Sequence, residues 1–238
     1  MQKSASPFHS GVTLSGISSM ATRLLLTDIA GQYRHEYGVN AQFESVGGVD
    51  AAKRVRAGEA FDLVALATDA IDALIAAGHV LADSKTDFVR SSVAIAIRAD
   101  AQHPAIDGEH ALRQAVLAAR SIGYSTGPSG TALMALFMRW GIADAVASRI
   151  IQAPPGVPVG QLVADGSAEL GFQQLSELMN LPGVDVLGTM PSGCEIVTTF
   201  SAALCVAASN PLHARALLAS LRSPTLDDLK RRHGMDPA

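Results

Sequence analysis

The chain has 238 residues, of which 48% are hydrophobic and 17% are charged, so it can bury a sizeable core as one large lobe or two small ones. This composition excludes a disordered or fibrous protein. The 18 Lys and Arg residues against 22 Asp and Glu residues give a net charge of −4, and the scattered basic residues argue against nucleic-acid binding.

Short apolar runs alternate with helical patterns along the chain, which is typical of an α/β fold. The expected strands cover residues 12–17, 41–46, 61–67, 91–98, 121–124, 169–172, 184–187 and 195–207. The expected helices cover residues 20–37, 49–57, 109–119, 131–140, 211–221 and 225–232, with one more that ends at residue 77 and a short one after residue 158. Three strand-then-helix units therefore occupy the N-terminal third of the chain.

The N-terminus and the apolar runs bear on where the protein resides. Residues 1–10 read as an N-terminal extension that contains Lys3 but is not followed by the apolar run of about 7 to 15 residues found in a secretory signal. No stretch reaches the roughly 18 apolar residues that a membrane-spanning helix needs. As written, the sequence predicts a cytoplasmic protein without a membrane span, and a periplasmic one if an export signal has been removed.

The two cysteines, Cys194 and Cys205, lack the close spacing and the His partners of a zinc site. We expect two free buried thiols, with a disulfide as the alternative. The histidines form no metal pattern, and the sequence holds neither a dinucleotide-binding glycine motif nor a phosphate-binding loop with its Lys. We therefore expect no metal and no cofactor.

One arrangement recurs along the chain: a strand ends in a small polar or glycine-containing loop that opens a helix. These loops contain Ser18 and Ser19, then Gly47 and Gly48, then Thr68 and Asp69, and finally Ser125, Gly127, Ser129 and Gly130. In an α/β sheet such loops gather at the carboxyl ends of the strands, where ligands bind. Helix N-termini offer free N–H groups and partial positive charge, so the pattern predicts a site for a small anion. The alternative is that each loop only caps its own helix, with Thr68 and Asp69 as the N-cap candidates of theirs.

Several polar side chains lie on or beside these loops. Arg23 follows Ser19 by one helical turn, from where its guanidinium could bind a ligand carboxylate, and the alternative is a solvated helix Arg. Gln173 and Gln174 follow a predicted buried strand and offer uncharged donors and acceptors, whereas the alternative places them on the surface at a helix start. Asp69 is the carboxylate that we expect at the rim of the site.

The order of these elements resembles the type II periplasmic-binding-protein fold and, within it, the molybdate-binding-protein-like family of solute receptors for ABC importers. The segments that carry the resemblance are Ser18-Ser19, residues 54–69, residues 91–97, residues 127–130 and residues 169–172. The resemblance implies two lobes, each a mixed β-sheet flanked by helices, with the ligand cleft between them. Lobe 1 would comprise residues 11–92 and 192–238, and lobe 2 residues 93–191.

Residues 17–23 and 171–174 are more similar to the aconitate isomerase branch of this superfamily. Gly47-Gly48 replaces a polar loop of the molybdate receptors, and Arg23, Gln173 and Gln174 are added, which suits a planar di- or tricarboxylate better than molybdate. This resemblance implies an isomerase that shifts a double bond by moving an allylic proton, and we take Asp69 or Ser18 as the proton-transferring group. The alternative is a non-catalytic solute-binding protein that delivers molybdate, or a similar oxyanion or carboxylate, to an ABC importer.

Overall fold

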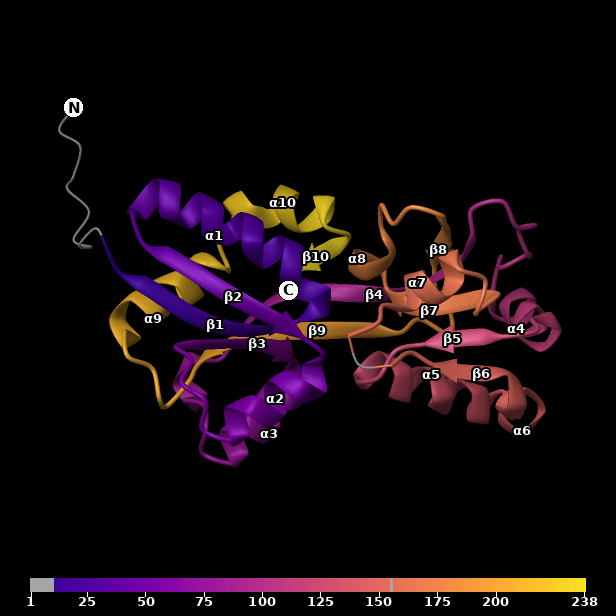
Figure 1. Ribbon diagram of the computed structural model, residues 1–238, viewed down its shortest axis with the longest axis horizontal. Coiled ribbons are helices and arrows are strands. Elements are labelled where there is room, and N and C mark those ends of the chain that lie inside the picture. Colours follow the sequence, from indigo (N-terminus) through magenta and orange to yellow (C-terminus); the bar gives the residue numbers. More distant parts are fainter. Residues whose placement is uncertain (1–10, 155) are drawn as a thin grey trace. The chain divides into compact units, whose positions relative to one another are not determined.

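The chain forms two compact units in the computed structural model, which describes residues 11–154 and 156–238. Unit 1 comprises Met1–Val89 and Thr199–Ala238, and unit 2 comprises Arg90–Thr198. The chain enters unit 2 along strand β4 (Thr86–Arg98) and returns along β9 (Val197–Leu204), as Figure 1 shows. The lobe boundaries that we expected, at residues 92/93 and 191/192, stay a prediction. The N-terminal extension, residues 1–10, lies outside the described residues.

Unit 1 is built on a sheet in the order β2-β1-β3-β9, with β10 paired to β4. Its other strands are β1 (Thr13–Ser19), β2 (Asn40–Val46), β3 (Leu63–Ala67) and β10 (Met235–Pro237). Its helices are η1 (Met20–Thr22), α1 (Arg23–Tyr37), α2 (Gly48–Arg56), α3 (Thr68–Ala76), η2 (Ala82–Ser84), α9 (Pro211–Ser220), η4 (Pro224–Leu226) and α10 (Asp227–Arg232). Strands β2 and β3 both run parallel to β1, whereas β9 runs antiparallel to β3.

The sheet of unit 1 is buried on both faces. All five residues of β3 are buried, as expected for the unbroken apolar run of a strand covered from both sides. One hydrophobic cluster joins the sheet to α1, α9 and α10, and another joins it to α2 and α3. Figure 1 shows α1 and α10 on one side of the strands and α2 and α3 on the other. The strand ends of unit 1 are therefore held between two packed layers of helices.

In unit 2 the strand order is β4-β7-β5-β6, with β8 paired to β4. Its strands besides β4 are β5 (Ile122–Tyr124), β6 (Ile150–Gln152), β7 (Leu170–Gln174) and β8 (Val184–Thr189). Its helices are α4 (Glu109–Ala118), α5 (Pro128–Arg139), α6 (Ala143–Val146), η3 (Ala147–Arg149), α7 (Val159–Ala164) and α8 (Leu175–Leu178). Strands β6 and β7 run parallel to β5, and β4 runs antiparallel to β7 and β8.

The predicted fold class is confirmed, because each unit is a mixed β-sheet flanked by helices. The three-residue strand β5 was predicted, because a glycine-containing loop follows it. Strands β6 and β10, of the same length, were not predicted, because so short a segment shows no usable alternation by itself. Helix α5 begins at Pro128 rather than at residue 131, because the fixed φ of proline suits the first turn of a helix. Strand β7 extends through Gln174, two residues beyond its predicted end.

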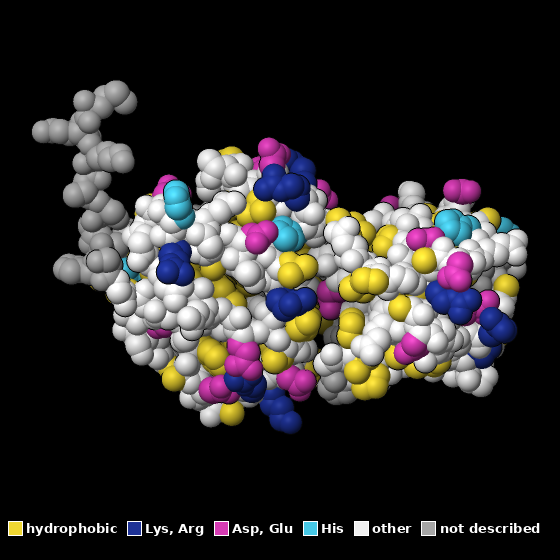
Figure 2. Space-filling model, turned by 45° about the horizontal axis from the view of Figure 1, so that its top comes forward, with side chains coloured by type: hydrophobic (Ala, Val, Ile, Leu, Met, Phe, Trp, Pro, Cys, Tyr) yellow, Lys and Arg dark blue, Asp and Glu magenta, His cyan; other side chains and the backbone are white. Residues whose placement is uncertain are grey.

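Cys194 and Cys205 are free and buried, as predicted. Burial raises the pKa of the Cys194 thiol to about 11 and that of Cys205 to about 12, so both are protonated near neutral pH. On the face drawn in Figure 2, basic and acidic side chains are interspersed over unit 1 rather than gathered into a patch of one sign. Across residues 11–154 and 156–238, no helix combines the length and apolarity needed to cross a bilayer.

Candidate functional site

Three parallel strands of unit 1 end together. Ser18 pairs in register with Ser45 on β2 and with Ala65 on β3, so the carboxyl ends of β1, β2 and β3 meet at one edge of the sheet. This edge, which we call edge 1, gathers the predicted residues Ser18, Ser19, Gly47, Gly48, Thr68 and Asp69. Candidate groups from three separate loops are thereby brought to one place within a single unit.

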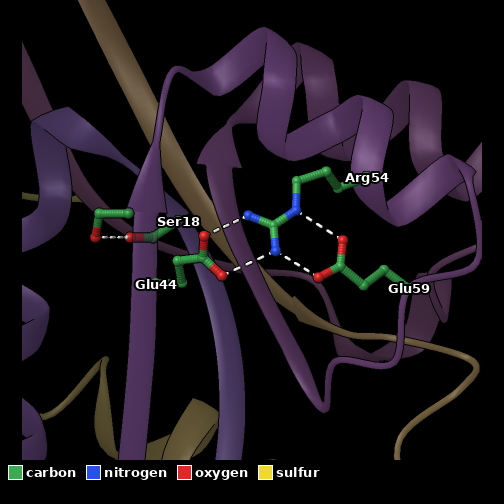
Figure 3. Close-up of polar contacts among 5 residues, drawn as sticks. Ser18, Glu44, Arg54 and Glu59 are labelled. Carbon is green, nitrogen blue, oxygen red and sulfur yellow. Dashed lines mark hydrogen bonds and ion pairs between the residues drawn. The ribbon is translucent and has the colours of Figure 1, made fainter. Parts of the chain in front are cut away.

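The serines of edge 1 are tied to their neighbours. Ser18 is fully buried, and its Oγ lies 2.8 Å from Ser45 Oγ (Figure 3). Ser19 is the N-cap of η1, and its Oγ accepts from the Ala21 N–H at 3.4 Å. A Cβ placed on Gly48 would stand 3.8 Å from Ser19 Oγ, so the absence of a side chain there leaves room beside this hydroxyl. Edge 1 is thus lined by small groups.

The predicted capping role of Thr68 and Asp69 is wrong. Ala67 occupies the N-cap position of α3, and no side chain caps the helix. Thr68 Oγ1 instead lies 2.5 Å from Ser201 Oγ on β9, and Ser201 Oγ donates to Asp87 Oδ1 at 2.5 Å. Asp69 is exposed in the first turn of α3, where its negative charge suits the helix N-terminus. The hydroxyl of Thr68 therefore belongs to a longer hydrogen-bonded chain that sequence reasoning did not find.

Arg23 and Arg54 differ in whether their guanidinium groups bind other residues of the protein. Arg23 is exposed at the start of α1, and within the described residues its guanidinium makes no hydrogen bond or ion pair. Arg54 on α2, in contrast, binds Glu44 with Nη1–Oε1 and Nη2–Oε2 distances of 2.5 and 2.8 Å, and its Nε donates to Glu59 at 2.7 Å (Figure 3). These bonds lower the pKa of both carboxyls and raise that of Arg54. Arg54 clamps β2 to the loop after α2, whereas the guanidinium of Arg23 is available to bind a ligand.

A second edge lies in unit 2, where β5 and β7 end together. Tyr124 pairs with Phe172, so the loop after β5 lies beside the end of β7. This edge, which we call edge 2, gathers the remaining predicted residues Ser125, Gly127, Ser129, Gly130, Gln173 and Gln174. Each unit therefore presents its own set of candidate residues, and the predicted interlobe position of the ligand stays a prediction.

The loop of edge 2 depends on its glycines. Gly127 has φ +102°, a left-handed conformation that glycine adopts without strain, and it is the N-cap of α5. A Cβ on Gly130 would stand 2.0 Å from the Ser125 carbonyl oxygen, which no side chain can tolerate. Ser125 Oγ and Ser129 Oγ lie 3.2 Å apart and close the loop. The backbone of the loop thus packs tightly against the first turn of α5.

A hollow of about 310 Å³ opens beside this loop, entirely within unit 2. It is lined by Tyr124, Ser125, Thr126, Gly127, Gly130, Thr131, Met134, Ala135, Met138 and Gln152. Gln152 ends β6, a strand that was not predicted, so sequence reasoning missed this residue. The hollow combines hydroxyl and amide groups with methionines along α5, and none of these lining residues is charged.

The two glutamines are buried at the end of β7, so their alternative placement on the surface is wrong. Gln173 Oε1 accepts from the Val159 N–H at the start of α7, and its Nε2 donates to Glu177 Oε2, both at 2.8 Å. Gln174 Nε2 donates to Thr198 Oγ1 at 2.8 Å, whereas Gln174 Oε1 is buried without a partner among the described residues. Both side-chain polar atoms of Gln173 therefore bind other residues of the protein, whereas Gln174 keeps one acceptor atom, Oε1, without a partner among the described residues.

Within the described segments, no group of three or more His, Cys, Asp and Glu residues is arranged to hold a metal ion. Besides the exposed carboxylate of Asp69, the two edges offer hydroxyls, backbone N–H groups and amides, and Arg23 at the start of α1 adds a guanidinium. Groups of these kinds bind anionic oxygens by hydrogen bonding.

Similar solved structures show which fold the chain has. The periplasmic molybdate-binding protein of Azotobacter vinelandii matches with a TM-score of 0.77 and 18% identity, covering 93% of this chain and 98% of that one. The sulfate-binding protein of Mycobacterium tuberculosis matches with a TM-score of 0.79 and 15% identity, covering 95% and 87%. The fold is therefore that of the two-lobed periplasmic solute-binding proteins.

Sequence comparison gives the family. The pattern of the family described as bacterial extracellular solute-binding protein matches residues 14–236, and the chain belongs to this family. An aconitate isomerase from a Pseudomonas species is 34% identical over 231 residues, which cover 94% of this chain and 88% of the relative. The predicted resemblance to molybdate-binding-like proteins and to their aconitate isomerase branch is confirmed.

Proposed function

We propose that the protein binds an unsaturated di- or tricarboxylate and isomerises it by an allylic proton shift. The observation that carries this proposal is the 34% identity, over 94% of the chain, to a protein named aconitate isomerase. The aligned residues include parts of both units, and the identity is higher than that of the solved structures that share only the fold. The substrate would be an anion, and the candidate residues are of the kinds that bind one.

The chemistry requires a base and a means of dispersing negative charge. Removal of an allylic proton leaves a carbanion whose charge spreads through the double bond into a carboxylate. Helices α2 and α3 begin at edge 1 and helix α5 begins at edge 2, so each unit offers N–H groups of the kind that bind a carboxylate. Unit 1 also offers the guanidinium of Arg23, which is free in the described part of the chain. One preorganised donor of this type lowers a barrier by roughly 3 to 4 kcal/mol. The presence of these groups supports the charge-dispersal part of the proposal.

For the base, the sequence offers Asp69 and Ser18. Asp69 is exposed beside Thr68, and Ser18 is buried and bonded to Ser45. An Asp69→Asn variant that keeps substrate affinity but loses turnover would support the first assignment. A Ser18→Ala variant tests Ser18 in the same way. If either variant turns over the substrate as fast as the original protein, the substituted residue is not the base.

The second candidate function is passive binding of molybdate, or a similar oxyanion or carboxylate, for delivery to an ABC importer from the periplasm. It is favoured by the family, which is described as extracellular and solute-binding, and by a fold shared with receptors for molybdate and sulfate. The two functions share an anion site and differ in whether a proton moves.

A proton NMR time course with trans-aconitate in deuterated buffer separates the two functions. The isomerase predicts the appearance of cis-aconitate with exchanged protons. A parallel thermal-shift titration with molybdate, sulfate and tricarboxylates measures binding by the rise of Tm with ligand concentration. A rise of Tm without turnover contradicts the isomerase and identifies the solute class of a binding protein.

A further inference from the structure

Thr68, Ser201 and Asp87 form a continuous chain of hydrogen bonds within unit 1. Thr68 Oγ1 lies 2.5 Å from Ser201 Oγ, and Ser201 Oγ lies 2.5 Å from Asp87 Oδ1. Both distances are those of short O–H···O bonds to a charged acceptor or within a polarised chain. The three residues are contributed by α3, β9 and β4 and are separated by 133 and 114 positions in sequence, so only the fold brings them together.

The direction of the protons along this chain is fixed by chemistry. An ionised carboxylate has acceptor oxygens only, so the single hydroxyl proton of Ser201 points to Asp87. Ser201 then has no proton left for Thr68, and the bond between them requires Thr68 to donate. With its own proton turned inward, Thr68 Oγ1 offers only lone pairs to its other side. The chain therefore ends at edge 1 in a proton acceptor.

The exposure of the three residues differs along the hydrogen-bonded chain in a way that suits proton transfer. Ser201 is 0% exposed, so water does not compete for its hydroxyl. Thr68, at the carboxyl end of β3, is half-buried and lies among the residues predicted to bind substrate. Asp87, at the opposite end of the hydrogen-bonded chain, is exposed. A proton taken up at Thr68 thus has an uninterrupted route to a carboxylate that exchanges with solvent.

We propose that this chain is the proton relay of the isomerisation, an inference that rests on the proposed function. The proton of the substrate C–H bond passes to Thr68 Oγ1 while the Thr68 proton passes to Ser201 Oγ and the Ser201 proton to Asp87 Oδ1. The C–H electron pair moves into the double bond system and the substrate carboxylate. The reverse transfers return one proton to the carbon two positions away, so Asp87 ends ionised and no other reactant is consumed. In this relay Thr68, rather than Asp69 or Ser18, is the catalytic residue that touches the substrate, and Ser201 and Asp87 act through it.

The test compares kcat and KM for trans-aconitate in four variants of the full chain. Asp87→Asn keeps an acceptor oxygen but cannot take up the proton, so kcat falls at least 100-fold, on the order expected for loss of a general base, while KM changes less than about twofold. Thr68→Val, which preserves shape but removes the hydroxyl, has the same effect, and Thr68→Ser restores kcat to within about tenfold of the original protein. Asp83→Asn is the matched control, because Asp83 is an exposed carboxylate of unit 1 bound to Arg215 at 2.9 Å, and its kcat is unchanged.

The outcomes separate this inference from the proposed function. Turnover by the original protein together with a kcat within about threefold in Asp87→Asn or Thr68→Val overturns the relay and leaves the isomerase standing. Absence of turnover in the original protein, with trans-aconitate or molybdate still raising its Tm, overturns both. If Asp87→Asn shows no cooperative melting transition, the contrast between Thr68→Val and Thr68→Ser decides, and equal kcat in those two overturns the relay.

Discussion

Edges 1 and 2 are both formed where parallel strands end, yet they offer different chemistry. At edge 1, hydroxyls reach across strands to other hydroxyls and, through Ser201, to the carboxylate of Asp87. At edge 2, the described hydroxyl pair Ser125–Ser129 closes its own loop, and the other groups are glycine backbone and buried amides. Hydroxyls bonded to a carboxylate are suited to moving a proton, whereas N–H groups and amides are suited to holding a charged oxygen. The two edges therefore differ in the chemistry that their side chains and backbone offer.

The largest effect is expected at Gly130. A Cβ there would stand 2.0 Å from the Ser125 carbonyl oxygen, so Gly130→Ala must displace the loop or the first turn of α5, at a cost of about 2 kcal/mol or more. We expect a lower midpoint in urea unfolding and a loss of anion binding on the order of 100-fold by thermal-shift titration.

The matched control for Gly130→Ala is Gly31→Ala, because Gly31 lies mid-helix in α1, where an added methyl would meet nothing within 4 Å outside its own helix. That change should stabilise the protein by about 1 kcal/mol through helix propensity and leave binding unchanged. If Gly130→Ala behaved like Gly31→Ala, the tight packing of the edge 2 loop would not be what shapes the binding groups.

The two glutamines of edge 2 should separate stability from binding. Gln173→Leu removes the acceptor of the Val159 N–H and the donor to Glu177, so unfolding should become easier by about 1 to 3 kcal/mol. Gln174→Leu loses one bond to Thr198 but also removes an unpartnered buried oxygen, so it should cost less stability. Gln174 Oε1 can only accept, so a contact with a substrate carboxylate has to use the second Nε2 proton, and loss of that bond in the variant lowers affinity roughly tenfold. Urea unfolding and ligand titration of both variants give the two readouts, and equal effects on both would show that neither glutamine is specialised for binding.

The sequence predicts some of the features compared here and not others. Strand ends, helix starts and the loops at Ser18, Gly47, Thr68 and Ser125 follow from periodicity and from small residues at strand termini. Contacts between distant segments do not follow, because they depend on strand order. Ser201 and Asp87 carry no local signal, and the buried Asp62, which accepts from the backbone N–H groups of Ser15 and Ser209 at 2.9 and 2.8 Å, is recognisable in the sequence only as a residue flanking a strand.

A smaller effect is expected from Arg23 at the start of α1. Arg23→Ala removes an exposed guanidinium with no partner of its own in the described part of the chain, so Tm should change little. Affinity for a tricarboxylate should fall about tenfold, as for a charge-assisted bond of about 1.5 kcal/mol. Arg34→Ala, in the last turn of the same helix, is the control that should leave affinity unchanged. Identical affinities in the two variants would remove Arg23 from the site and weaken the case for a carboxylate substrate.

The smallest effect is expected at the hydrogen bond between Trp140 and Glu109, both of which lie in unit 2. Trp140, the single tryptophan of the chain, donates from Nε1 to Glu109 Oε1 at 2.5 Å, and Arg139 donates to the same oxygen at 2.8 Å. The hydrogen bond from Trp140 and the charge of Arg139 lower the pKa of Glu109. A carboxyl with a lowered folded pKa contributes stability above its unfolded pKa and loses that contribution as the pH falls through the folded value. Tryptophan emission should therefore change at a pH below the ordinary range of a glutamate carboxyl, because the indole loses a charged acceptor when Glu109 is protonated. In Glu109→Gln that transition should disappear, because the amide does not titrate, and its persistence would assign the acid change to unfolding elsewhere in unit 2.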